Sequence, residues 1–131
     1  MLDVRAGATR LREIAPGVEQ KSLEQLAARV REGEDFEAEI VIPRSASEAA
    51  SSRPEYREAH ETTLRADCVD VYVHPGPIRF AAGVVDETAA VAVMRDEQPH
   101  ALALSEGKGL RAWAETLFEE YRAASTPKTE L

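Results

Sequence analysis

The chain has 131 residues, with 24 acidic and 16 basic side chains, a net charge of -8 and 44% hydrophobic residues. This length fits one domain, and the hydrophobic content is that of a globular protein rather than a disordered one. An acidic surface repels phosphates, and no run of Lys and Arg is long enough to form a basic face. The composition therefore excludes direct nucleic-acid binding by this chain.

The basic residues are almost all arginine, because Lys21, Lys108 and Lys128 are the only lysines. An acid-rich and lysine-poor composition is typical of salt-loving archaea, whose acidic surfaces remain hydrated in concentrated salt. The alternative interpretation is an ordinary acidic bacterial protein.

The single cysteine, Cys68, excludes a disulfide within the chain and a cysteine-based zinc site. We interpret it as a small buried hydrophobe at the start of a strand. No apolar stretch approaches the roughly 18 residues of a membrane span, and the N-terminus lacks the apolar core of a signal peptide. We expect a cytoplasmic protein that makes no membrane contact.

The first 20 residues show no clear hydrophobic period and end at the Ala15-Pro16-Gly17 punctuation. Arg10, Leu11 and Ile14 fit a short helical turn. We therefore interpret residues 1–20 as a connector or N-terminal stub, 21–125 as a single α/β domain, and 126–131 as a frayed tail.

A helix is predicted from Ser22, which begins a Ser-x-x-Gln capping box, to Gly33 at the C′ position. Residues 36–42 alternate apolar and acidic side chains and predict a strand, which Pro43 ends. A second helix is predicted from Pro54 to about residue 66.

Four further strands are predicted at 69–74, 78–85, 90–94 and 101–104, the last three joined by short turns. The final helix carries an apolar stripe, in which we expect Trp113 to anchor the helix on the sheet. The members of the stripe are Leu110, Trp113, Ala114, Leu117, Phe118 and Tyr121.

These elements predict an α/β (α+β) fold with a mixed five-stranded sheet. Strands 36–42 and 69–74 should be parallel, because a crossover helix joins them, and 78–105 should form an antiparallel meander. Helices pack on the sheet, and the C-terminal helix is amphipathic.

No catalytic motif is present. Gly107-Lys108-Gly109 lacks the upstream glycine and the following Ser or Thr of a phosphate-binding loop, and no Gly-x-Ser-x-Gly sequence occurs. The three histidines have no His four residues on, so a metal site is not expected. We therefore predict a protein that is not an enzyme and that has no cofactor and no metal.

One group of polar residues is predicted to meet through topology. The strands of such a sheet bring arginine and histidine side chains to one edge, where open α/β sheets bind ligands. Three arginines in an acidic protein suit a small anion, whereas the alternative is pairing with Asp96 and Glu97. The six residues of this predicted anion site are Arg44, Ser45, His74, Arg79, Arg95 and His100.

Four segments carry a resemblance to a known family: 30–38 (VREGEDFEA), 69–73 (VDVYV), 80–86 (FAAGVVD) and 113–122 (WAETLFEEYR). They resemble the C-terminal effector domain of archaeal winged helix-turn-helix regulators, especially haloarchaeal ones of the methanogenesis-regulator type. Related sugar-responsive regulators carry a similar domain with a phospholipase-D-like fold. The resemblance implies a sensor domain that binds a small ligand or a partner, and a homodimer.

The chain departs from that family in two ways. Residues 1–32 are too few for a winged helix, so we expect either a fragment of a longer regulator or a stand-alone relative. The His-x-Lys motif of phospholipase-D enzymes is missing, so their chemistry is not implied. Two alternatives stay open, which are a stand-alone signalling protein without ligand and a degenerate phospholipase-D-like hydrolase.

Overall fold

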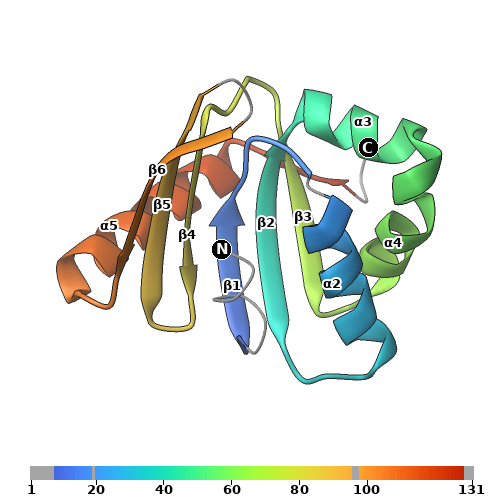
Figure 1. Ribbon diagram of the computed structural model, residues 1–131, viewed down its shortest axis with the longest axis horizontal. Helices are drawn as coiled ribbons and strands as arrows, with labels where there is room; N and C mark the ends of the chain where they lie inside the picture. The colour runs from blue at the N-terminus through green and yellow to red at the C-terminus, as the bar shows by residue number, and fades with distance from the viewer. Residues whose placement is uncertain (1–7, 19, 96–97, 129–131) are drawn as a thin grey trace.

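The computed structural model describes residues 8–18, 20–95 and 98–128, with the backbone alone at 94–95 and 98–102. Within these residues, four helices pack on one seven-stranded sheet of order β6-β5-β4-β1-β2-β3-β7 (Figure 1). The elements are β1 (Arg10–Ile14), α2 (Gln20–Arg31), β2 (Glu37–Pro43), α3 (Arg44–Ser52), α4 (Pro54–Arg65), β3 (Val69–His74), β4 (Phe80–Val85), β5 (Thr88–Arg95), β6 (Gln98–Ser105), α5 (Lys108–Ala123) and β7 (Thr126–Pro127).

The sheet is mixed, as predicted. Strands β2 and β3 are parallel, and β4, β5 and β6 form an antiparallel meander. The predicted number of strands is wrong, because β1 and β7 raise it from five to seven within the described residues.

Strand β1 replaces the predicted helical turn and lies in the middle of the sheet, parallel to β2 and antiparallel to β4. Leu11 and Ile14 are each only 1% exposed and belong to cores on opposite faces of the sheet. A short strand covered on both faces does not alternate between apolar and polar residues. The sequence pattern therefore could not identify β1 as a strand.

Gly83 of β4 allows β1 to lie next to it. A Cβ atom at Gly83 would stand 2.4 Å from the backbone oxygen of Arg12, which is closer than any real contact. Glycine is used where another backbone approaches this closely. The pairing of β1 with β4 therefore depends on the absence of a side chain at Gly83.

The first two residues of the predicted tail also join the sheet. In β7, Thr126 pairs with Val73 and Pro127 with Tyr72, antiparallel to β3. A two-residue strand has no periodicity that a sequence could reveal.

Helix α2 begins at Gln20, so the predicted start with a cap at Ser22 is wrong. Its end is as predicted. Gly33 has a φ of 68°, and its N–H donates to the carbonyl of Val30, while the N–H of Glu34 donates to that of Arg29. This pair of bonds is the Schellman ending, in which glycine adopts the left-handed conformation without steric cost.

The predicted second helix is α4, with Pro54 in its first turn. Helix α3 precedes it and was not predicted. Its buried side chains are Ala46, Ser47 and Ala50, which are too small to form a recognisable hydrophobic stripe.

The helices form layers on both faces of the sheet. On one face, Leu26 of α2 packs against a core that includes Leu11, Phe36 and Ala38, with Cys68 half-buried beside it. On the other face, Figure 1 shows α5 crossing behind the strands. None of the helices in the described part is long and apolar enough to cross a membrane.

The anchor of α5 is Phe118 rather than Trp113, so that prediction is wrong. Phe118 is fully buried among Ile14, Val41 and Ile78, whereas Trp113 is 50% exposed. The apolar stripe of α5 is wider than its contact with the sheet, and Trp113 lies on the flank of that stripe. Periodicity identifies the stripe but not which of its members reaches the core.

Candidate functional site: the clamp at the start of the central strand

The predicted anion site lies along the edge where β2, β3 and β5 end and β4 and β6 begin. Arg44 and Ser45 are exposed in the first turn of α3, which directly follows β2. Arg79 is exposed just before β4. Because β1 lies between β2 and β4, these residues stand on either side of its end.

His74 ends β3 and is half-buried. Its Nδ1 lies 3.1 Å from the backbone nitrogen of Gly76, which donates to it, and its ring lies 5.0 Å from that of Tyr121 in α5. The histidine therefore has packing and hydrogen-bonding partners of its own.

Arg95 and His100 lie in β5 and β6, but their side chains are outside the described part, as are Asp96 and Glu97. The backbone directions bring the six residues to one edge of the sheet. Their convergence into one anion pocket stays a prediction.

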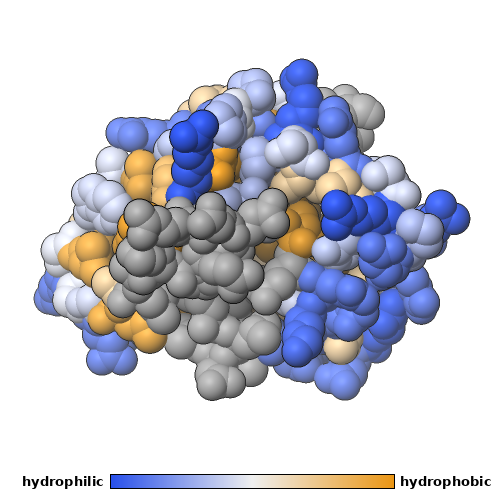
Figure 2. All heavy atoms as spheres, turned by 45° about the horizontal axis from the view of Figure 1, so that its top comes forward, coloured by the Kyte–Doolittle hydropathy of each residue, from blue (hydrophilic) through white to orange (hydrophobic). Residues whose placement is uncertain are grey.

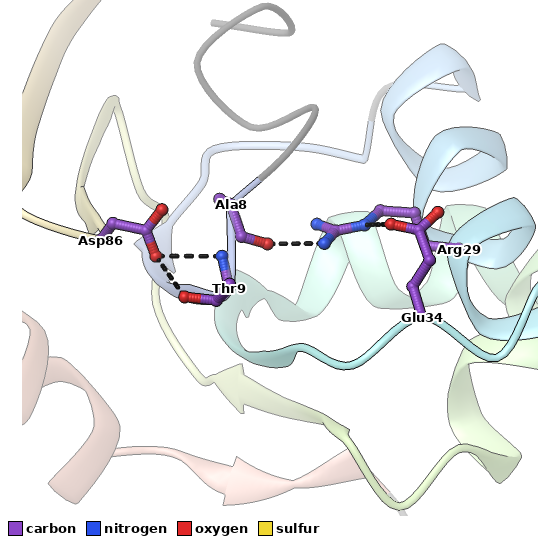
Figure 3. Close-up of polar contacts among 5 residues, drawn as sticks. All are labelled: Ala8, Thr9, Arg29, Glu34 and Asp86. Carbon is purple, nitrogen blue, oxygen red and sulfur yellow. Dashed lines mark hydrogen bonds and ion pairs between the residues drawn. The ribbon is translucent and has the colours of Figure 1, made fainter.

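A different polar cluster, which we call the clamp, is well defined at the start of β1 (Figure 3). One side of the clamp is Arg29 of α2, whose side chain is only 9% exposed. Its Nη2 donates to the carbonyl oxygen of Ala8 at 2.6 Å, and its Nε donates to Glu34 at 2.9 Å. The guanidinium also lies 4.3 Å from the ring centroid of Phe36. A buried arginine is tolerated because its charge is paired in this way.

The other side of the clamp is Asp86 in the turn between β4 and β5. Its Oδ1 accepts hydrogen bonds from the backbone N–H of Thr9 at 3.0 Å, from the Thr9 hydroxyl at 2.9 Å and from the N–H of Arg10 at 2.9 Å. Its own N–H donates to the carbonyl of Arg10 at 2.8 Å. One carboxylate therefore fixes two consecutive residues at the entry of the central strand.

Asp86 has a φ of 52°, the only positive φ of a non-glycine residue in the described chain. Aspartate tolerates this region better than most residues, but glycine is preferred at such hairpin positions. Partial burial raises the pKa of Asp86, yet the hydrogen bonds from Arg10 and Thr9 outweigh it, so the pKa lies below its ordinary value. The carboxylate is thus held in its charged form.

Hydrogen bonds from Lys128 hold the C-terminal end of the described chain. Lys128 donates through Nζ to the carbonyl of Ser47 and to the hydroxyl of Ser51, each at 3.1 Å, and so ties the residue after β7 to α3. Burial lowers the pKa of Lys128 to about 8. Burial, and then the nearby charge of Lys128, also lower the pKa of His60, which is 8% exposed.

Ion pairs also hold α5 to the sheet. Arg12 donates to Glu115 at 2.7 Å, and Arg122 contacts both Glu119 and Glu39 of β2. Among the described residues, no group of three or more His, Cys, Asp or Glu could hold a metal ion.

Sequence reasoning missed the clamp. Arg29 lies three residues after Leu26 on the same side of the helix, so its place on the buried face of α2 was a usable signal. No such signal marked Asp86, because its role depends on β1, which the hydrophobic pattern of the sequence did not reveal.

The comparison with protein families gives one match. The chain fits the family model described as the middle domain of the methanogenesis regulatory protein FilR1, over residues 1–124. No curated protein matches it. The chain therefore belongs to the FilR1 middle-domain family, which confirms a domain of an archaeal transcription regulator, although the matched model is a middle domain and not the C-terminal domain that the resemblance implied.

Proposed function

We propose, from this family membership, that the chain is the non-catalytic sensor part of an archaeal transcription regulator, working in the cytoplasm. It binds a small ligand or a partner, associates with a second copy, and biases a DNA-binding part. The acid-rich, lysine-poor composition supports a haloarchaeal source. A relationship to the phospholipase-D-like fold stays a prediction.

The observation that carries the proposal is the clamp. Thr9 and Arg10 are held by Asp86, and Ala8 is held by Arg29, so the entry of the central strand is fixed from both sides. A change in the sheet that reaches Asp86 or Arg29 also reaches whatever precedes β1. The entry of β1 is therefore suited to pass a signal between the sheet and an upstream segment.

Asp86→Asn tests this role in the native gene. Asparagine keeps the shape of the side chain and removes its charge, which weakens the bonds to Thr9 and Arg10. We expect altered transcript levels of the regulated genes at an unchanged protein level, in the same direction as in a deletion strain. The matched control is Glu87→Gln, which removes one charge from the exposed neighbour in the same turn.

Transcripts that stay normal in the deletion strain and in Asp86→Asn would favour the alternative of a stand-alone signalling protein. The hydrolase alternative is tested separately with a chromogenic phosphodiester. We expect no turnover above the buffer rate.

The ligand is proposed to be a small anion at the predicted edge. Arg44 and Arg79 are both exposed there, and forked arginine donors suit phosphates and carboxylates. Phosphate should raise the melting temperature of the wild type, and Arg44→Ala with Arg79→Ala should abolish the rise. Arg57→Ala on α4, also exposed, is the control. An unchanged rise in the double variant would refute the site.

A further inference from the structure

The two edges of the sheet differ. Strand β7 closes one edge by pairing with β3, whereas β6, at the other edge, has a neighbouring strand only on its β5 side within the described residues. An edge strand presents a row of unpaired N–H and C=O groups that can pair with another strand. Pro99 has no backbone N–H, so the part of β6 that offers a continuous open edge is the stretch after it, up to Ser105.

The charge pattern of β6 is unusual for an edge. Natural edge strands are commonly protected by charged side chains, above all lysine. Gln98–Ser105 contains no Asp, Glu, Lys or Arg, although 31% of the chain is charged. In a chain of net charge -8, a charge-free strand is where two copies approach with the least repulsion.

Exposed apolar side chains occur in the edge strand β6, in its neighbour β5 and in helix α5. Among the described residues, the large hydrophobic side chains that are exposed are Val93 of β5 at 52%, Leu104 of β6 at 48% and Trp113 of α5 at 50%. Figure 2 shows hydrophobic patches mixed with polar surface at the end of the molecule where β5 and β6 lie, and a mostly hydrophilic surface over α2, α3 and α4. Aromatic residues are enriched at protein interfaces, and charged ones are depleted at their centres.

Two of these side chains belong to one face. Val93 lies opposite Phe80 in the register of β4 and β5, and Phe80 packs in the core under α5. Val93 therefore lies on the α5 face of the sheet, the face to which Trp113 also belongs. Val84 packs under α5 and pairs with Ala89, and Ala89 pairs with Ser105, so Ser105 lies on the α5 face. Successive side chains of a strand point to opposite faces, so Leu104 lies on the other face.

We propose that β6 pairs antiparallel with β6 of a second copy, so that the two sheets become one. The axis of such a pair is perpendicular to the sheet, so the α5 helices of both copies lie on the same face. Trp113 and Val93 then face their counterparts across the join. A strand paired with its own copy uses the same edge twice and closes at the dimer.

This inference deepens the proposed self-association and names its surface. It predicts that a charge introduced in β6 weakens dimerisation, whereas the same charge introduced outside the interface does not. Ala103 of β6 and Ala112 of α5 are both exposed, so Ala103→Lys and Ala112→Lys make the same chemical change. Like charges brought together in an interface repel each other, so Ala103→Lys should weaken dimerisation at least about tenfold. Ala112→Lys should leave it unchanged.

Sedimentation of the full chain at micromolar concentration measures the effect, at the lowest salt concentration that keeps the chain folded, because concentrated salt screens the repulsion between the introduced charges. The wild type should sediment at twice its 14.4 kDa mass, and Ala103→Lys should shift towards 14.4 kDa at the same concentration. Trp113 is the only tryptophan, so its fluorescence gives a second readout. We expect a blue shift as wild-type protein is concentrated, and none with Ala103→Lys.

Trp113→Ser provides a second disrupting variant, whose half-exposed position makes retention of the fold expected. A wild type that stays at 14.4 kDa would overturn both the self-association and this interface. A dimer that survives Ala103→Lys and Trp113→Ser would overturn the interface alone. The transcript experiment on Asp86→Asn is independent of both results.

Discussion

The two halves of the sheet differ in the size of their buried side chains. The parallel half, β1 to β3, places Leu11, Val41 and Val73 between helices on both faces. The meander half, β4 to β6, is made largely of small residues such as Ala82, Ala89 and Ala90. Large side chains that interlock in a core stabilise the fold. The meander half has smaller buried side chains and an edge strand, β6, whose free side is available for contacts. The comparison indicates that one half holds the fold and the other half is available to a partner.

The largest expected effect distinguishes two aromatic residues of the same helix. Phe118→Ala removes a fully buried ring from the core under the parallel half, and such truncations cost about 3–5 kcal/mol. Trp113→Ala removes a half-exposed ring beside the meander and should cost less than about 1 kcal/mol. Urea unfolding at low protein concentration measures both. Equal losses would contradict the division between the halves.

The junction of the halves is tested by Gly83→Ala. The new Cβ would collide with the backbone of Arg12 and push β1 away from β4, at a cost of about 1–3 kcal/mol. Gly109→Ala is the matched control, because it lies in α5 with no atom within 4 Å of the new carbon. Alanine there should raise stability by about 0.5–1 kcal/mol. Thermal unfolding of both variants should therefore shift in opposite directions.

A smaller effect is expected from the clamp. Arg29→Met keeps most of the packing on Phe36 but leaves the buried carbonyl of Ala8 without this donor, at a cost of about 1–2 kcal/mol. Hydrogen exchange should become faster at the amides of β1 than at those of β3. Arg31→Met, on an exposed arginine two residues on, should change neither quantity. Uniform loosening of all strands would show that Arg29 does not act locally.

A further expected effect is a pH dependence at the edge of the parallel half. Burial lowers the pKa of Lys128 from 10.5 to about 8 in the folded chain. Between these pH values the unfolded chain keeps a proton that the folded chain has lost, so the free energy of unfolding rises with pH. Lys128→Met should flatten that rise between pH 8 and 10.5, whereas Lys21→Met should not. The same slope in wild type and Lys128→Met would remove Lys128 as its source.

The sequence revealed those parts of the fold that have a clear period or a diagnostic connection. The crossover after Ile42 predicted parallel strands, and the short turn at Asp86 predicted the meander. The order of the sheet was not predictable, because β1 is buried on both faces and does not alternate. Trp113 was misjudged because helical spacing gives the direction of a stripe but not how deep each member lies.

The candidate site was predictable only as an edge. Strand directions, which follow from connection lengths, place Arg44, His74 and Arg79 at one edge of the sheet, while their use as an anion site stays a prediction. The clamp was not predictable, because Thr9 and Asp86 are 77 residues apart and meet only through β1. Contacts of that separation leave no local pattern in a single sequence.

The central place of β1 has a consequence for synthesis of the chain. Of the described strands, β1 is made first, yet one of its sides is bonded to β4, and Arg10 can meet Asp86 only after 76 further residues have been made. Contacts between distant residues form slowly, because a long loop must close before they do. In the nascent sheet, β1 therefore lacks its second neighbour until the hairpin of β4 and β5 has been synthesised. Until then, the edge of the growing parallel half stays open to wrong partners, which is the stage at which such chains are prone to aggregate.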